Sequence, residues 1–415
     1  MKSAKSALCI AALLGFVISA GGLRAQAPAP SEWVGAWAAS QQIPEPQNSL
    51  PPDALRDATL RQIVHLSIGG DTLRVHVSNA FGTQPLLFTS VHIARALTAG
   101  SSSAIDAATD RAVTFNGSPS VVVPAGAEYI SDPVHLEMPA LSSLAITIYF
   151  PSPPARETGH PGSRADAYYV HGNQVSAPSL TGAQAIEHWY QISGVDLLAP
   201  AGAGAVVALG DSITDGHATT TNGNDRWTDD LAARLQASPS TRDISVLNQG
   251  IGGNCLLTQC LGPNTLARFD RDVLAQPGVR WLIVFEGVND LGGLTFHGPV
   301  AAAAHQELVR RVIGAYQQII QRAHAHGIEV IGATITPFAG SGYYHPDAAT
   351  LADLDAVNAW IRARGHFDAV LDFNKVIADP TDPERLKPEW DSGDHLHPGP
   401  AGYRALADSI PLNLF

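Results

Sequence analysis

The period of the apolar residues changes near residue 200, and this change is the strongest constraint on the fold. From Trp33 to about Asp196, apolar residues alternate with polar ones or form short β-branched runs between Gly, Pro, Asn and Asp. Beyond residue 200, short apolar runs alternate with segments of helical period. Period two is typical of half-buried strands, whereas buried runs between helices are typical of a parallel sheet. The chain is therefore expected to contain two domains of different class.

The N-terminal part, residues 31–198, is predicted to be an all-β accessory domain. Segments with strand character are 63–67, 72–78, 88–93, 120–123 and 144–150. A strand of this kind buries its apolar face only when a second sheet covers it, which favours a β-sandwich, jelly-roll-like in type.

The C-terminal part, residues 201–415, is predicted to be an α/β domain. Its apolar runs are 205–209, 244–247, 281–285, 330–334 and 369–373. Helical periods between and after them cover 227–236, 264–274, 302–326, 350–362 and 401–409. Right-handed crossovers then give a five-stranded parallel sheet with helices on both faces. In such a sheet, an active site is expected at the carboxyl ends of the strands.

Residues 1–25 are predicted to be a cleaved signal peptide, which implies a secreted or periplasmic protein. Lys2 and Lys5 precede an apolar stretch over 7–20, and small residues surround Ala25. The alternative is a membrane anchor, but the stretch is short for a span and no stop-transfer charges follow it. No stable membrane insertion is expected.

The charge balance excludes one class of partner. Lys and Arg number 25 against 38 Asp and Glu, for a formal net charge of −13, and no dense basic cluster offsets it. Such a surface repels a phosphate backbone, so nucleic acid is not an expected partner. The oligomeric state is left open.

Chemically useful residues follow several of the apolar runs. The four segments are GDSITDG at 210–216, NQGIGGN at 248–254, GVND at 287–290 and DSGDHLHP at 391–398. Together they bring a serine hydroxyl, backbone and side-chain amide donors, and an Asp/His pair to one edge of the predicted sheet. Serine is a weak nucleophile at its free pKa, so a neighbouring histidine base and donors for the developing oxyanion are what it requires.

These four segments resemble blocks I, II, III and V of the SGNH (GDSL) hydrolase superfamily, and the resemblance covers residues 204–415. It implies a flavodoxin-like three-layer α/β/α fold and hydrolysis of esters without metal or cofactor. Ser212 would be the nucleophile, His397 the base and Asp394 the partner that orients His397.

The resemblance also implies an oxyanion hole formed by the Ser212 N–H, Gly253 and Asn289. Gly253 is chosen because it lies five residues after Asn248, as in the family pattern. Gly250 and Gly252 are the alternatives if the segment 248–254 aligns with the family pattern in a different register.

The histidine-rich segment has a second interpretation. His395, His397, Asp391 and Asp394 are all possible ligands of a metal ion. No further His/Asp cluster follows another predicted strand, which favours the hydrolase interpretation. On an extended segment His395 would point away from His397, so His395 is expected to be structural.

Cys255 and Cys260 are predicted to form a disulfide. Cys9 would leave with the signal peptide, and these two are then the remaining cysteines. In an oxidising compartment such a pair closes a small loop. Their position just after Gly253 suggests that the bond braces the oxyanion loop.

Two N-terminal segments, 33–40 and 59–82, are similar to the β-rich extension of a secreted arylesterase-like and carbohydrate-esterase-like branch of the superfamily. This domain either binds polysaccharide, for example through its aromatic residues between 168 and 190, or only shapes one wall of the cleft.

The sequence therefore predicts a secreted serine esterase for short acyl groups, including O-acetyl or aryl esters of carbohydrates. Two alternatives stay open: a lipase or thioesterase for longer acyl chains, and a carbohydrate-binding protein whose hydrolase site has decayed. The loop 338–346, with its two glycines and two tyrosines, is a candidate gate of the cleft.

Overall fold

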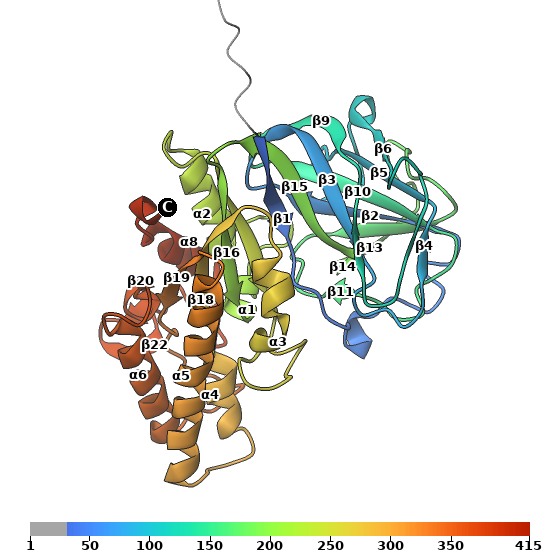
Figure 1. Cartoon of the computed structure of the whole chain (residues 1–415). Helices are drawn as coiled ribbons and strands as arrows, with labels where there is room; N and C mark the ends of the chain where they lie inside the picture. The colour runs from blue at the N-terminus through green and yellow to red at the C-terminus, as the bar shows by residue number, and fades with distance from the viewer. Residues whose placement is uncertain (1–30) are drawn as a thin grey trace, which may run out of the picture.

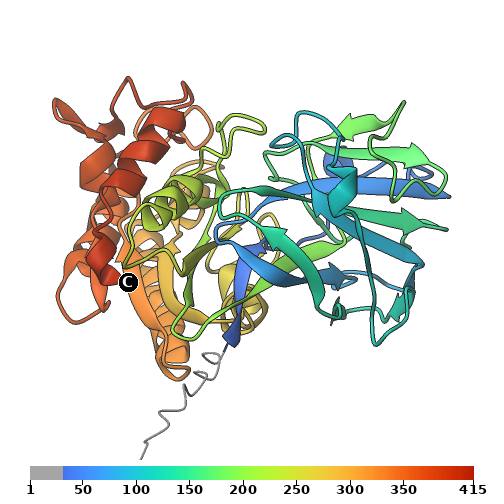
Figure 2. The same ribbon diagram turned by 90° about the horizontal axis from the view of Figure 1, so that it is seen from above.

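The computed structural model describes residues 31–415. The predicted signal peptide and Cys9 lie outside the described residues. Figure 1 shows a β-rich region beside an α/β region, and Figure 2 shows the same two regions from above. Within residues 31–415, no helix has both the length and the apolar character needed to cross a membrane.

The N-terminal region contains two larger antiparallel sheets. The first has the strands β1 (Ser31–Ala38), β15 (Ile192–Pro200), β3 (Gly70–Ser78), β8 (Glu128–Ile130) and β9 (Val134–Met138). The second has β13 (Gln184–Ile186), β12 (Ala167–His171), β2 (Ala58–His65), β10 (Ser143–Phe150), β5 (Ser90–Arg95) and β6 (Arg111–Val113). Two small ribbons pair β4 (Leu86–Phe88) with β7 (Val121–Val123), and β11 (Gly159–His160) with β14 (Trp189–Tyr190). The predicted β-rich character is confirmed, while the jelly-roll-like type remains a prediction.

The C-terminal region is built on one parallel sheet. Its order is β17 (Ile244–Gly250), β16 (Gly204–Gly210), β18 (Val279–Phe285), β19 (Glu329–Ala333) and β20 (Ala369–Leu371). All five predicted runs lie in or overlap these strands, so the five-stranded parallel sheet is confirmed. The order, with β16 between β17 and β18, is that of flavodoxin-like sheets. The three-layer arrangement itself stays an expectation.

The helices lie close to their predicted bounds where the apolar period is long. They are α1 (Ser212–Asp215), α2 (Trp227–Gln236), α3 (Thr265–Phe269), α4 (Val288–Leu294), α5 (Ala302–His324), α6 (Ala348–Arg362), α7 (Phe373–Ile377) and α8 (Pro400–Asp408). A π-helical turn, Asp270–Leu274, continues α3, and a hairpin of β21 (Ala378–Asp379) and β22 (Asp382–Leu386) follows α7.

The two regions are joined by more than the chain between them. Strand β1 packs against β17, and Figure 1 shows it close to the α/β sheet. Gly35 in β1 is needed there, because a Cβ would lie 2.8 Å from Leu247 Cδ1. The Gly35 N–H donates to Pro277 O at 2.9 Å, and the Val246 N–H donates to Ser67 Oγ at 3.1 Å. One continuous apolar core therefore extends through both regions.

Three of the aromatic residues between 168 and 190 belong to this core. Tyr169, Trp189 and Tyr190 are buried, and Trp189 packs edge to face on Trp37 with ring centroids 4.9 Å apart. Buried rings are not available to stack on a sugar, which favours the scaffold interpretation of this region for these three residues.

Candidate active site

Ser212 is the first residue of α1, and only Asp211 separates it from the carboxyl end of β16. The side chain of Asp211 caps this helix by accepting the Ile213 N–H at 2.9 Å. Gly210 allows the sharp turn, because a Cβ would lie 2.2 Å from Thr214 Oγ1 and 2.4 Å from Phe285 O. Strand, glycine and cap together fix the place of the Ser212 hydroxyl.

Ser212, His397 and Asp394 form a continuous hydrogen-bonded chain. Ser212 Oγ lies 2.8 Å from His397 Nε2, and His397 Nδ1 lies 2.6 Å from Asp394 Oδ2. The other oxygen of Asp394 accepts the backbone N–H groups of Leu396 and His397 at 2.9 and 2.8 Å. Burial acts to raise the pKa of Asp394, but the hydrogen bonds from His397 outweigh it and hold that pKa far below its usual range. An ionised Asp394 requires a proton on Nδ1, which leaves Nε2 free to accept the proton of Ser212.

The turn that carries His397 differs from the extended segment that was expected. Asp391 and Pro398 form an isolated bridge, and His395 between them has a φ of 61°. His395 is exposed, and its Nδ1 lies 2.5 Å from Asp391 Oδ2. The four residues of the alternative metal site thus form two separate pairs, Asp391 with His395 and Asp394 with His397.

The hydrogen bonds of the 248–254 loop distinguish its three candidate glycines. The Gly250 N–H donates to Asn248 Oδ1 at 2.9 Å, and the Gly252 N–H donates to Asp215 Oδ2 at 3.0 Å. Within residues 31–415, the N–H groups of Gly253 and Ser212 have no such acceptor. Gly253 also has a φ of 69°, and a Cβ there would lie 2.7 Å from Leu261 Cδ1. These contacts favour Gly253 over the two alternative registers.

Both the nitrogen and the oxygen of the Asn289 side-chain amide form hydrogen bonds. Its Nδ2 donates to Asn254 O at 2.6 Å, and its Oδ1 accepts the hydroxyl of Tyr344 at 2.6 Å. An amide nitrogen carries two hydrogens, so one remains for a ligand. Tyr344 lies in the loop predicted to be a gate, but it is buried, and a Cβ at Gly292 would overlap its ring at 2.3 Å. No sequence pattern connects Tyr344 with Asn289, because 55 residues separate them.

Replacing Tyr344 by Phe is expected to lower kcat by about 3- to 10-fold and to leave KM nearly unchanged. The ring stays in place, but the Asn289 amide loses the partner that fixes its orientation, and misaligned oxyanion donors cost transition-state stabilisation. Steady-state kinetics on p-nitrophenyl acetate measure the effect. Tyr343→Phe is the matched control, because Tyr343 is 63% exposed and its hydroxyl has no partner among the described residues. Equal effects of the two variants would contradict this role of Tyr344.

His217 was not predicted as part of the site. His217 directly follows the GDSITDG segment. The centroids of the His217 and His397 rings lie 4.0 Å apart, and His217 Nε2 lies 3.9 Å from Asp394 Oδ2. Burial and the nearby His397 lower the pKa of His217 to about 4, so this ring is neutral at neutral pH. Position directly after the serine motif is the one sequence signal that pointed to it. Among the described residues, His217, Asp394 and His397 also offer ligand atoms within 4.8 Å of one another.

The predicted disulfide between Cys255 and Cys260 is present, with Cα atoms 5.7 Å apart. The residue after it, Leu261, donates its N–H to Gly253 O at 3.2 Å and packs over Gly253. The residue that follows the disulfide loop therefore contacts Gly253, and the bracing role of the bond stays a prediction.

Comparison with known proteins agrees with this geometry. Residues 208–405 match the model of the GDSL-like Lipase/Acylhydrolase family. This part of the chain belongs to the GDSL-like hydrolase family. The GDSL domain is accordingly a serine hydrolase of carboxylic esters. No curated protein matches the chain significantly in sequence.

Solved structures similar to the GDSL domain cover about half of the chain. A G-D-S-L family protein from Desulfitobacterium hafniense is 24% identical, covering 49% of this chain and 96% of its own, with a TM-score of 0.36. A GDSL-like lipase from Bacteroides thetaiotaomicron is 18% identical, with coverages of 50% and 85% and a TM-score of 0.36. A catalytic mutant of an acetylxylan esterase from Geobacillus stearothermophilus is 20% identical, with coverages of 50% and 91% and a TM-score of 0.37. Similarity at this level does not identify a substrate.

Three buried acids of the GDSL domain lie behind Ser212. Burial raises the pKa of Asp211 to about 7 and that of Asp290 to about 6. Burial and the neighbouring Asp211 raise the pKa of Glu286 well above its usual range. Both carboxyl oxygens of Glu286 lack a hydrogen-bond partner among the described residues, and Oε2 lies 3.7 Å from the Arg268 guanidinium. The raised pKa favours the protonated form of Glu286, although Arg268 acts to lower it, and this costs stability at higher pH.

Glu286→Gln is expected to reduce the loss of stability on going from pH 5 to pH 8. A pKa that is raised in the folded state means that the folded protein binds more protons than the unfolded one above pH 4.5, so stability falls as pH rises. The amide keeps the shape of the protonated acid and does not titrate. Thermal unfolding at both pH values should show a smaller fall of Tm in the variant, by about 3 °C or more. An unchanged fall would mean that Glu286 is ionised in the folded protein.

Proposed function

We propose that this protein is a secreted serine esterase that hydrolyses short-acyl carboxylic esters, including O-acetyl or aryl esters of carbohydrates, through an acyl-enzyme on Ser212. The observation that carries the proposal is the chain of contacts from Ser212 Oγ through His397 to Asp394, at 2.8 and 2.6 Å. Secretion is supported by the sequence of residues 1–25 and by the disulfide, since such bonds persist in oxidising compartments.

The first half-reaction acylates the enzyme. Ser212 Oγ attacks the ester carbonyl carbon while its proton moves to His397 Nε2, and Asp394 stabilises the resulting imidazolium. Negative charge develops on the former carbonyl oxygen, where the N–H groups of Ser212 and Gly253 and the free hydrogen of Asn289 Nδ2 receive it. The tetrahedral intermediate expels the alcohol, which takes the proton from His397.

The second half-reaction releases the acid. A water molecule gives a proton to His397 Nε2 and attacks the acyl carbon of the ester on Ser212. The same oxyanion donors stabilise the second intermediate, and collapse returns the proton to Ser212 Oγ. His397 thus acts once as base and once as acid in each half, and no cofactor is required.

The cavity between the two regions is separate from the reacting serine. It is lined by His65, His160, Asp215, Arg226 and others, but by neither Ser212 nor His397. A long acyl chain needs an apolar channel that begins at the acyl carbon.

One observation favours longer or aromatic groups as a second candidate. Phe296 and Tyr343 are 47% and 63% exposed, and their rings lie 5.4 Å apart between centroids. Tyr343 also contacts Tyr344, the partner of Asn289. Exposed aromatic rings beside an oxyanion donor suit an aryl group or the start of an acyl chain, as in a lipase or thioesterase. An intact hydrogen-bonded chain counts against a decayed site with only a binding function.

The substrate proposal is tested with p-nitrophenyl esters from acetate to palmitate, beside acetylated xylan. The highest kcat/KM is expected for acetate or another short ester, with no loss after dialysis against EDTA. A maximum at long chains would favour the lipase alternative, and no hydrolysis of any ester would contradict the esterase. Loss of activity in EDTA, restored by a metal, would assign a metal to His217, Asp394 and His397.

A further inference from the structure

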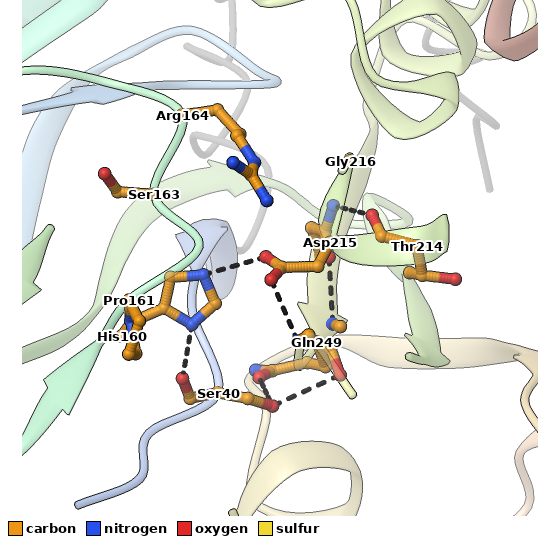
Figure 3. A network of polar contacts seen from close by, with 12 residues as sticks. Ser40, His160, Pro161, Ser163, Arg164, Thr214, Asp215, Gly216 and Gln249 are labelled. Atoms are coloured by element: carbon orange, nitrogen blue, oxygen red, sulfur yellow. Dashed lines mark hydrogen bonds and ion pairs between the residues drawn. The ribbon is translucent and has the colours of Figure 1, made fainter. Parts of the chain in front are cut away.

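Asp215 connects three parts of the molecule that meet behind Ser212. It lies three residues after Ser212, at the end of α1, and is 2% exposed. Its Oδ2 accepts the Gly252 N–H at 3.0 Å, and its Oδ1 lies 3.0 Å from Nε2 of His160. Figure 3 shows this carboxylate between the histidine of the N-terminal region and the loop that leads to Gly253.

His160 is oriented so that it donates to Asp215. It belongs to β11 of the N-terminal region and is 5% exposed, with its ring stacked on Trp189. Its Nδ1 lies 2.7 Å from Ser40 O, a carbonyl that only accepts hydrogen bonds. Asp215 is also an acceptor, so each ring nitrogen of His160 faces an acceptor from a different part of the chain. Burial acts to raise the pKa of Asp215, but His160 and the guanidinium groups of Arg164 and Arg226 outweigh it and keep that pKa below its usual value.

The chain around His160 leaves no room for another arrangement of Asp215. A Cβ at Gly162 would lie 1.9 Å from Asp215 Oδ2. Arg226 donates from Nε to Asp215 O at 3.1 Å and from its terminal nitrogen to Ser163 O. In Figure 3 the guanidinium of Arg164 also points toward Asp215. The segment 160–164 of the N-terminal region thus encloses a residue of the GDSL domain.

A second contact joins the same N-terminal segments to the end of β17. Ser40, whose carbonyl accepts from His160, has its Oγ 2.8 Å from Gln249 Oε1 and 2.7 Å from Arg268 Nη1. Arg268 is fully buried and donates to Gln249 O at 2.6 Å and to Gly210 O at 2.9 Å. The strand ends that carry Ser212 and the 248–254 loop are therefore both tied to the N-terminal region.

We propose that His160 is a positioning residue for ester hydrolysis: through Asp215 it fixes the distance between the N–H groups of Ser212 and Gly253, so that the N-terminal region completes the oxyanion hole. The inference rests on the function proposed above. Asp215 belongs to the turn of Ser212 and also accepts the N–H of Gly252, the residue before Gly253. A donor that moves by about 1 Å costs up to about 100-fold in rate, so a residue that never touches substrate controls kcat.

Two substitutions of His160 separate its two hydrogen bonds. In His160→Gln the amide nitrogen takes the place of Nε2 and still donates to Asp215, whereas in His160→Asn it takes the place of Nδ1 and reaches only Ser40 O. We expect kcat for p-nitrophenyl acetate to fall less than about 3-fold in the Gln variant and about 10- to 100-fold in the Asn variant, with KM within about 3-fold in both. Equal kcat values for His160→Gln and His160→Asn would overturn the proposal. A rise in KM with an unchanged kcat would overturn it as well.

The controls separate positioning from folding and from failure of the proposed function. His188→Ala removes a hydrogen bond to Pro161 O, one residue from His160, and is expected to keep the native kcat. If His160→Asn does not fold, Asp215→Asn tests the same link at nearly constant size, and a native kcat in that variant would overturn the proposal. Ser212→Ala is measured in parallel. Full activity of Ser212→Ala would contradict the proposed function, whereas an inactive Ser212→Ala beside a fully active His160→Asn would contradict this inference alone.

Discussion

Ser212→Ala is expected to lower kcat for p-nitrophenyl acetate by at least about 10⁴-fold. Without Oγ no acyl-enzyme forms, and the remaining oxyanion donors support only a slow attack by water. Removing one hydroxyl from a turn held by Gly210 and by the Asp211 cap should leave the fold unchanged. The measurement is steady-state kinetics, with circular dichroism and Tm as checks of folding.

Ser392→Ala is the matched control for that variant. Ser392 is exposed on the turn before His397, and its hydroxyl has no hydrogen bond within the described part of the chain. It should retain kcat within about 2-fold of the native value. A Ser212→Ala enzyme as active as the Ser392→Ala enzyme would remove Ser212 from the mechanism.

The two histidines of the 391–398 turn should differ sharply. His397→Ala is expected to lower kcat by at least about 10³-fold, because no other group lies within hydrogen-bond distance of Ser212 Oγ in the described structure. His395→Ala should change kcat by less than about 3-fold, because His395 is exposed and pairs with Asp391. Both variants are compared at one pH on the same ester. Losses of equal size would show that the turn as a whole, or a metal bound to it, carries the activity.

The sequence predicted best those features that depend on local order along the chain. Parallel strands end at one edge of a sheet, so the residues that follow β16, β17 and β18 had to lie close together, and Asn289 Nδ2 indeed donates to Asn254 O of the 248–254 loop. The disulfide is also a local feature, because only four residues separate the two cysteines. Long amphipathic segments such as α2 and α5 were placed within about two residues of their bounds.

Features that depend on contacts between distant segments were missed. Gly253 was chosen from the family spacing with Gly250 and Gly252 as alternatives, and the acceptors of the Gly250 and Gly252 N–H groups, which favour that choice, could not be foreseen. Tyr344 reaches Asn289 from a loop that the sequence suggested as a gate. His160 lies 55 residues from Asp215, in a region that was expected to be a separate domain.

The strands of the N-terminal region were also placed less well than those of the sheet. The predicted strand 63–67 is in fact β2, Ala58–His65, because buried polar residues such as Arg61 and Gln62 broke the expected alternation. Arg61 is tolerated in the core because it donates to Thr147 Oγ1 at 2.9 Å and to Ser103 O at 2.7 Å. Burial lowers its pKa to about 10. Partners so distant in sequence leave no pattern that a single sequence can reveal.

Covalent labelling of the native protein with a fluorophosphonate tests the central claim most directly. The reagent phosphonylates a serine whose hydroxyl is activated by a base and whose oxyanion donors are in place, so it needs the whole arrangement of Ser212, His397 and the N–H groups. Mass spectrometry of the intact protein and of its peptides should show one adduct, on Ser212, formed at the rate at which esterase activity is lost. Activity that survives complete labelling, or an adduct on any other residue, would contradict the account.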